Sequence, residues 1–135
     1  MYRTRPEFVG LVCCLVALAS AARAGDRTET FRLKAGAASA TRTGTIRGYD
    51  GVNYVFGAKS GQAMSIVFTG SEPSCYFNVY GPGGGEAVFN GSSSGNEFRT
   101  TLKASGSYRA QVYLMRNAAR DNRACKYSIT FEIAG

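Results

Sequence analysis

Two arginines are the residues best placed to do chemistry in this 135-residue chain. Arg116 and Arg120 stand four positions apart in the segment RNAAR, with Asn117 between them. Two guanidinium groups on one short segment can bind carboxylates through paired, charge-assisted hydrogen bonds. Arginines in a polar stretch are more often simply solvated, so the spacing alone leaves both interpretations open.

A tyrosine in a turn is the second candidate. Tyr49 and Asp50 lie between two glycines in the tetrad GYDG, and this composition predicts a turn. Tyrosine and arginine are among the residues most often found as interface anchors. From the residues alone, the simpler interpretation of Tyr49 is a side chain folded back over the edge of the core.

The segment SGSY contributes three further candidates, Ser105, Gly106 and Tyr108. Its simplest interpretation is a hairpin turn followed by a core tyrosine.

Catalysis is disfavoured by what the composition lacks. The chain contains no histidine, which is the commonest general base and metal ligand, so no Ser-His or Cys-His pair can form. The carboxylates are dispersed, and no zinc or calcium spacing occurs. The basic residues are scattered, with no nucleic-acid motif. We therefore expect neither an enzyme, nor a cofactor or metal site, nor a nucleic-acid partner.

Residues 1–24 are expected to be a secretory signal peptide. Arg3 and Arg5 precede an apolar run at residues 8–18, and small residues at Ala22 and Ala24 suit cleavage after Ala24. A retained membrane anchor is the alternative, but the apolar run is short for crossing a bilayer. Cleavage predicts a periplasmic or secreted single domain at residues 25–135, with no membrane association and a net charge near +5.

Export also bears on the cysteines. Cys13 and Cys14 leave with the signal peptide, so Cys75 and Cys125 remain. An even pair in an exported chain predicts one disulfide, with two free buried thiols as the alternative.

The elements that position these residues are expected to be strands. No segment of the mature chain sustains a helical period, whereas Tyr and Phe alternate with polar residues between glycine-rich turns. This pattern predicts an all-β fold, a small antiparallel β-sandwich of about eight short strands. The expected strands cover residues 28–34, 41–48, 53–58, 63–69, 75–80, 98–102, 108–115 and 125–133, with 87–89 as a short strand or bulge.

The strand at residues 108–115 carries apolar residues on both faces, which is typical of a central strand. We expect the last strand, 125–133, to pair antiparallel with it. The SGSY turn and the two arginines then leave opposite ends of the central strand. Residues 90–96 have the composition of a mobile loop, and residues 116–120 that of a polar loop.

Six segments stand in a characteristic order along the chain. They are GTIRGYD (44–50), YVFGAKSGQ (54–62), YGPG (80–83), LKASGSY (102–108), RNAAR (116–120) and KYSITFEI (126–133). Together they resemble the bacterial periplasmic inhibitors of goose-type (g-type) lysozyme, from about Thr41 onward. The SGxY element is shared with other bacterial lysozyme-inhibitor families, and the RNxxR stretch is the sharper mark. The cysteine pair and the Gly- and Ser-rich loop at 84–96 depart from that pattern.

The resemblance implies a β-sandwich that binds g-type lysozyme through the tyrosine of GYD and the arginines of RNxxR. These positions are Tyr49, Arg116 and Arg120 in this sequence. The arginines would pair with carboxylates of the lysozyme cleft, and Tyr49 would pack in a sugar subsite. Asp50, Ser105, Gly106, Tyr108 and Asn117 are secondary or structural candidates.

A second resemblance supports a different function. The frame YxFxAxxGQ…GPG…ASGxY is also similar to small β-sandwich domains appended to secreted bacterial peptidases. On that basis the alternative is a carbohydrate-binding or peptidase-accessory module without inhibitory activity.

Overall fold

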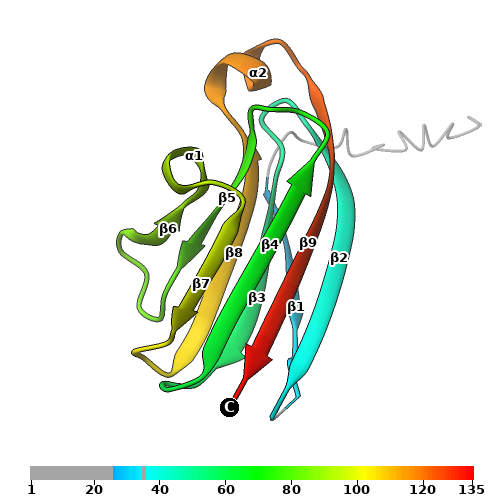
Figure 1. Cartoon of the computed structure of the whole chain (residues 1–135). Coiled ribbons are helices and arrows are strands. Elements are labelled where there is room, and N and C mark those ends of the chain that lie inside the picture. The colour runs from blue at the N-terminus through cyan, green and yellow to red at the C-terminus, as the bar shows by residue number, and fades with distance from the viewer. Residues whose placement is uncertain (1–25, 35) are drawn as a thin grey trace, which may run out of the picture.

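The computed structural model describes residues 26–34 and 36–135, and this part of the chain forms nine strands and two short helices (Figure 1). The predicted signal peptide and its cleavage site lie outside the described residues. None of the described helices is long and apolar enough to cross a membrane. The elements are β1 Asp26–Phe31, β2 Ala38–Arg47, β3 Gly51–Ala58, β4 Ala63–Gly70, β5 Cys75–Tyr80, β6 Ala87–Asn90, α1 Gly91–Ser94, β7 Glu97–Thr101, β8 Gly106–Leu114, α2 Arg116–Arg120 and β9 Ala124–Ala134.

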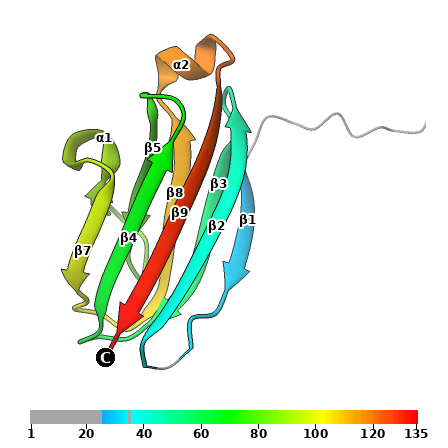
Figure 2. The ribbon, with the colours of Figure 1, turned by 45° about the vertical axis from the view of Figure 1, so that its right-hand side comes forward.

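The strands form two sheets packed face to face, which confirms the predicted β-sandwich (Figure 2). The five-stranded sheet has the order β1-β3-β8-β5-β6, and the four-stranded sheet has the order β2-β9-β4-β7. All neighbouring strands are antiparallel except β1 and β3, which run parallel. β8 lies at the centre of its sheet, as its pattern predicts.

The predicted pairing of the last strand with the central strand is wrong. β9 pairs with β2 and β4 in the four-stranded sheet, whereas β8 pairs with β3 and β5 in the other. The physical reason is that both strands bury one face only. In β9 the residues alternate between buried and more exposed, and in β8 Ala110, Val112 and Leu114 are buried while Gln111 and Tyr113 face outward. Two such strands can bury their apolar faces against each other across the sandwich.

Aromatic rings join the two sheets in the core. Phe131 of β9 packs against Phe31, Tyr54 and Phe56 of the opposite sheet, with ring centroids 4.9 to 5.8 Å apart. Phe131 is 1% exposed, and fully burying a side chain of this kind stabilises a fold by about 1.5–3 kcal/mol. The alternation read from the sequence therefore corresponds to one inward face on each sheet.

Two segments predicted as loops contain a single helical turn each. Residues 91–94 form α1, capped by Asn90, whose side-chain oxygen accepts from the backbone N–H of Ser92. Residues 116–120 form α2, which buries Ala118 and Ala119 against the end of the sandwich. A helix of four or five residues is too short to show a 3.6-residue period, so the sequence pattern could not indicate either one.

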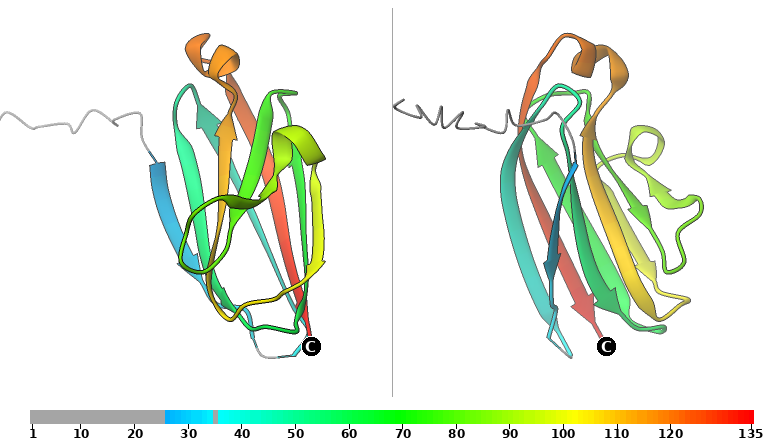
Figure 3. Two further views of the ribbon diagram at one scale, coloured as in Figure 1. Left: turned by 90° about the vertical axis from the view of Figure 1, so that its left-hand side faces the viewer. Right: turned by 180° about the vertical axis from the view of Figure 1, so that it is seen from behind.

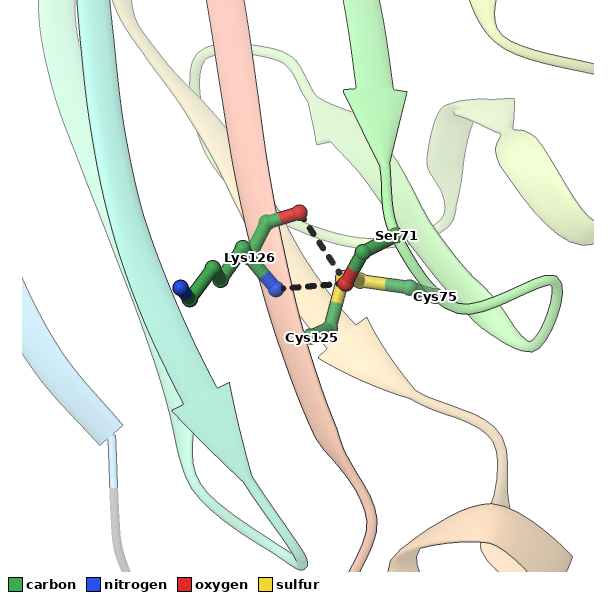
Figure 4. Close-up of a disulfide and its surroundings, with 4 residues drawn as sticks. All are labelled: Ser71, Cys75, Cys125 and Lys126. Carbon is green, nitrogen blue, oxygen red and sulfur yellow. Dashed lines mark hydrogen bonds between the residues drawn. A yellow bond between two sulfur atoms is a disulfide. The ribbon is translucent and has the colours of Figure 1, made fainter.

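The predicted disulfide is present and links the two sheets. Cys75 is the first residue of β5 and Cys125 the second residue of β9, and their Cα atoms are 6.4 Å apart (Figure 4). Beside it, Ser71 Oγ accepts from the backbone N–H of Lys126 at 2.9 Å. Cys75 pairs with Leu114, the last residue of β8, so the disulfide lies next to both strands that α2 connects.

Candidate functional site

The three principal candidate residues lie at one end of the sandwich, which we call the α2 end. It consists of α2, the β2–β3 turn at residues 48–50 and the β4–β5 loop at residues 71–74. Figure 3 shows, from the side and from behind, that α2 covers this end while the C-terminus lies at the other. Tyr49, Arg116 and Arg120 all belong to the α2 end.

Tyr49 projects from a turn that is tied to the chain following α2. The backbone N–H of Asp50 donates to Arg47 O at 3.0 Å and closes the turn, and that of Gly48 donates to Arg123 O at 2.9 Å. Gly48 has φ +60°, and a Cβ there would lie 2.8 Å from Asn122 Oδ1, so this position favours glycine. Tyr49 is 60% exposed. The simpler interpretation, a tyrosine folded over the core edge, is therefore wrong.

Arg116 and Arg120 are both exposed, one at each end of α2. Within the described part of the chain, neither guanidinium makes a hydrogen bond or an ion pair. Arg47 and Arg123, at the same end, differ in this respect. Arg47 Nη1 donates to Asn122 O at 3.1 Å, and Arg123 pairs with Glu72 at 3.2 Å.

Asn117 has a local role in α2. Its Oδ1 accepts from the backbone N–H of Ala118 at 2.9 Å, at the first turn of the helix. The backbone N–H of Ala119 donates to Met115 O, and the two buried alanines fix α2 on the sandwich. The arginines are thus carried by a docked helix and not by a free loop.

The SGSY segment lies at the opposite end, and its residues make contacts within the fold. Ser105 Oγ accepts from the backbone N–H of Ser60 at 2.8 Å, which joins two neighbouring turns. Tyr108 is 4% exposed, and its hydroxyl donates to Ala104 O at 2.6 Å. Gly106 has φ +145°, and a Cβ there would lie 2.9 Å from Pro82. The two ends are separated by the length of β8, as the sequence predicts.

A groove that the sequence did not indicate adjoins Tyr49. It has a volume of about 290 Å³ and runs from the β2–β3 turn onto the outer face of the five-stranded sheet. Its lining residues are Asp26, Gly48, Tyr49, Asp50, Gly51, Asn78, Gln111, Tyr113 and Leu114. They come from β1, β3, β5 and β8 and from the turn, so no single motif could have revealed the groove.

Tyr113 of this groove is held by neighbouring side chains. Its hydroxyl donates to Asn78 Oδ1 at 3.1 Å, and its ring lies 6.3 Å from that of Tyr76. Burial raises the pKa of Tyr113 above the usual value for tyrosine, so the hydroxyl is protonated and can donate. The described residues hold no group of three or more His, Cys, Asp or Glu side chains that could bind a metal ion.

A known protein similar to this chain is an inhibitor of one class of lysozyme. The inhibitor of g-type lysozyme from Escherichia coli K12 is 31% identical over 125 residues, which cover 90% of this chain and 92% of the relative. No family model matches the sequence.

Solved structures similar to this chain include further inhibitors of g-type lysozyme. The periplasmic g-type lysozyme inhibitor PliG of Aeromonas hydrophila has a TM-score of 0.69 and 32% identity, covering 80% of this chain and 98% of its own. PliG of Salmonella Typhimurium has a TM-score of 0.61 and 31% identity, covering 79% of this chain and 97% of its own. A pre-peptidase C-terminal domain of Bacillus anthracis collagenase has a TM-score of 0.53 and 17% identity, covering 81% of this chain and 94% of its own. At that identity the collagenase domain shares the fold alone.

Proposed function

This chain belongs to the family of inhibitors of g-type lysozyme, and from that membership we propose that it binds g-type lysozyme and blocks the active-site cleft with its α2 end. Its relatives are protein inhibitors and not enzymes, and the PliG proteins among its structural neighbours are periplasmic. We accordingly assign this protein to the periplasm, as the signal-like residues 1–24 also suggest.

One observation supports this assignment of the surface. Arg116 and Arg120 are exposed without a partner side chain in the described residues, and they share the α2 end with an exposed tyrosine. Neither arginine forms a side-chain pair within the described fold, so both guanidinium groups are available to an acidic partner. Tyrosine and arginine are also among the side chains most enriched at the centres of protein interfaces.

The chemistry of a muramidase supplies the complementary groups. Glycoside hydrolysis uses carboxyl groups that flank the scissile bond, in a cleft shaped for a sugar polymer. The guanidinium groups of Arg116 and Arg120 can each donate two parallel hydrogen bonds to such a carboxylate. Tyr49, which lies on the β2–β3 turn, would occupy a sugar subsite with its ring. The inhibitor would then exclude substrate without any reaction of its own.

The test is a set of single substitutions in the mature protein, assayed by lysis of cell walls. Removing one partner of a buried charge pair costs about 2–5 kcal/mol of binding, so Arg116→Ala or Arg120→Ala should weaken inhibition at least about tenfold. Arg32→Ala is the matched control, because Arg32 is also an exposed arginine but lies outside the α2 end. Equal, small effects of all three substitutions would contradict the assignment of the surface.

The alternative function is tested in the same assay. Adding the wild-type protein to g-type and c-type lysozymes should reduce g-type lysis. Unchanged lysis, with the protein pelleting on peptidoglycan, would instead support a carbohydrate-binding module. The collagenase domain of the same fold does not favour that alternative, because its 17% identity carries no function to this chain.

A further inference from the structure

The α2 end alone is too small to account for a stable complex. A standard protein–protein interface covers about 800 Å² on each partner, which is some 20–30 residues. Three side chains on one helical turn and one tight turn supply only part of that area. The partner must therefore contact further surface, and the groove beside Tyr49 is continuous with the proposed site.

The groove has the opposite charge to α2. The exposed carboxylate of Asp26 lines it, and no lysine or arginine is among the described residues of its lining. Tyr49 lies between the two regions, because its turn contacts the chain after α2 on one side and lines the groove on the other. The surface around Tyr49 is thus cationic toward α2 and anionic toward β1.

The anionic side is held in place by the fold. Asp26 Oδ2 accepts from Gln111 Nε2 at 3.1 Å and from Asn53 Nδ2 at 3.4 Å, which fixes the carboxylate on the outer face of the sheet. Gly51 lies beneath it, and a Cβ there would collide with Asp26 Oδ1. An ionised carboxylate has about four lone-pair sites, so these two bonds leave capacity for a further donor.

The shape and walls of the groove suit one long side chain. Its volume of about 290 Å³ lies at the lower limit of small-molecule pockets, which hold about 300–1,000 Å³. Two tyrosines, Tyr49 and Tyr113, line it together with the carboxylates. Tyrosine rings attract ammonium and guanidinium groups and also pack on the aliphatic stem of the same side chain. Tyr113 is already held by Asn78 and Tyr76, so little further ordering is required.

We propose that this groove receives a lysine or arginine side chain of the g-type lysozyme, while Arg116 and Arg120 bind its carboxylates. The proposal rests on the proposed inhibitory function and adds a second, oppositely charged contact to it. In this arrangement the lysozyme contacts the α2 end and the adjoining outer face of the five-stranded sheet. It does not contact the four-stranded sheet.

The test compares the same charge change at two places. In the mature protein, Asp26→Lys should weaken inhibition of g-type lysozyme at least about tenfold, and Asp26→Asn should have a smaller effect in the same direction. Glu132→Lys is the control, because Glu132 is exposed on β9 of the other sheet and the net charge changes equally. Long-range attraction between the proteins is then altered alike in both lysine variants. Urea unfolding of each variant measures its stability.

The outcomes separate the two proposals. If the wild type does not inhibit, the proposed function fails and the groove with it. If wild type inhibits and the Arg116 and Arg120 variants are weakened, but Asp26→Lys stays within about twofold of Glu132→Lys, only the groove proposal is overturned. It is also overturned if the Asp26 variants lose stability and keep full inhibition. Asp26 would then serve the fold through its bonds to Gln111 and Asn53.

Discussion

Removing the Cys75–Cys125 disulfide should lower the stability of this domain by about 4 kcal/mol while leaving the folded inhibitor active. Both sulfurs lie in the core, where Cys75 is 4% and Cys125 is 0% exposed. Alanines at both positions preserve an apolar environment and introduce no buried polar group. The double variant Cys75→Ala/Cys125→Ala therefore acts mainly on the unfolded chain.

The magnitude comes from the length of the loop that the bond closes. The two cysteines are 50 residues apart, and the chain-entropy relation gives about 4 kcal/mol for a loop of that size. A domain of about 110 residues is stabilised by roughly 5–15 kcal/mol in total, so the loss is a large fraction. With an unfolding entropy of about 2.1 cal/mol/K per residue, the melting temperature should fall by about 15–20 °C.

Two measurements check this reasoning. Urea unfolding of the oxidised wild type and the double variant gives the difference in free energy, and cell-wall lysis at a temperature where both are folded gives the inhibition. A loss below about 1 kcal/mol would refute the entropic account. Weaker inhibition by the fully folded variant would refute the second part. It would show that the disulfide also positions α2, since Leu114 pairs with Cys75 where α2 begins.

Two further predictions concern buried hydroxyl groups. The Tyr54 and Tyr127 hydroxyls are 2.6 Å apart in the core, and burial, followed by this hydrogen bond, raises the pKa of Tyr54. Because the folded pKa exceeds the unfolded value of about 10, stability should be constant below pH 10 and fall above it by about 1.4 kcal/mol per pH unit. Urea unfolding at pH 8 to 11 measures this slope, and an equally steep slope in Tyr54→Phe would contradict it. Ser65 Oγ is buried without a hydrogen-bond partner among the described residues, so Ser65→Ala should leave stability unchanged or raise it by up to about 1 kcal/mol. Ser71→Ala is the comparison in the same unfolding assay and should lose about 0.5–1.5 kcal/mol of stability, because Ser71 Oγ accepts from Lys126 N. A destabilised Ser65→Ala would show instead that the Ser65 hydroxyl is hydrogen-bonded in the folded protein.

The strands could be predicted from the sequence because each buries one face. The alternation in β9 places Cys125, Tyr127 and Ile129 inward, and the structure follows it residue by residue. Which strands pair could not be predicted in the same way. An alternating strand satisfies its pattern in either sheet, so nothing in β9 itself distinguishes pairing with β8 from pairing with β2 and β4. The same holds for the parallel pairing of β1 with β3.

The candidate site was predictable only as far as it lies in short segments. Arg116 and Arg120 stand together in the sequence, and their helix preserves that proximity. Tyr49 was a candidate through the family resemblance, but its exposure required the structure, since the exposure of a turn tyrosine depends on how Gly48 docks against Arg123. The groove was beyond sequence analysis, because Asp26 and Gln111 are 85 residues apart before the sheet brings them together.

The chain ends at the opposite end of the sandwich from α2. Gly135 O accepts from Gln62 Nε2 at 3.1 Å, which ties the C-terminus to the β3–β4 turn at that end (Figure 1). A peptide tag, fluorophore or solid support attached through Gly135 would thus point away from Tyr49, Arg116 and Arg120. Immobilised in this way, the protein would present its α2 end to the solution, and it could serve as an affinity matrix for purifying g-type lysozymes.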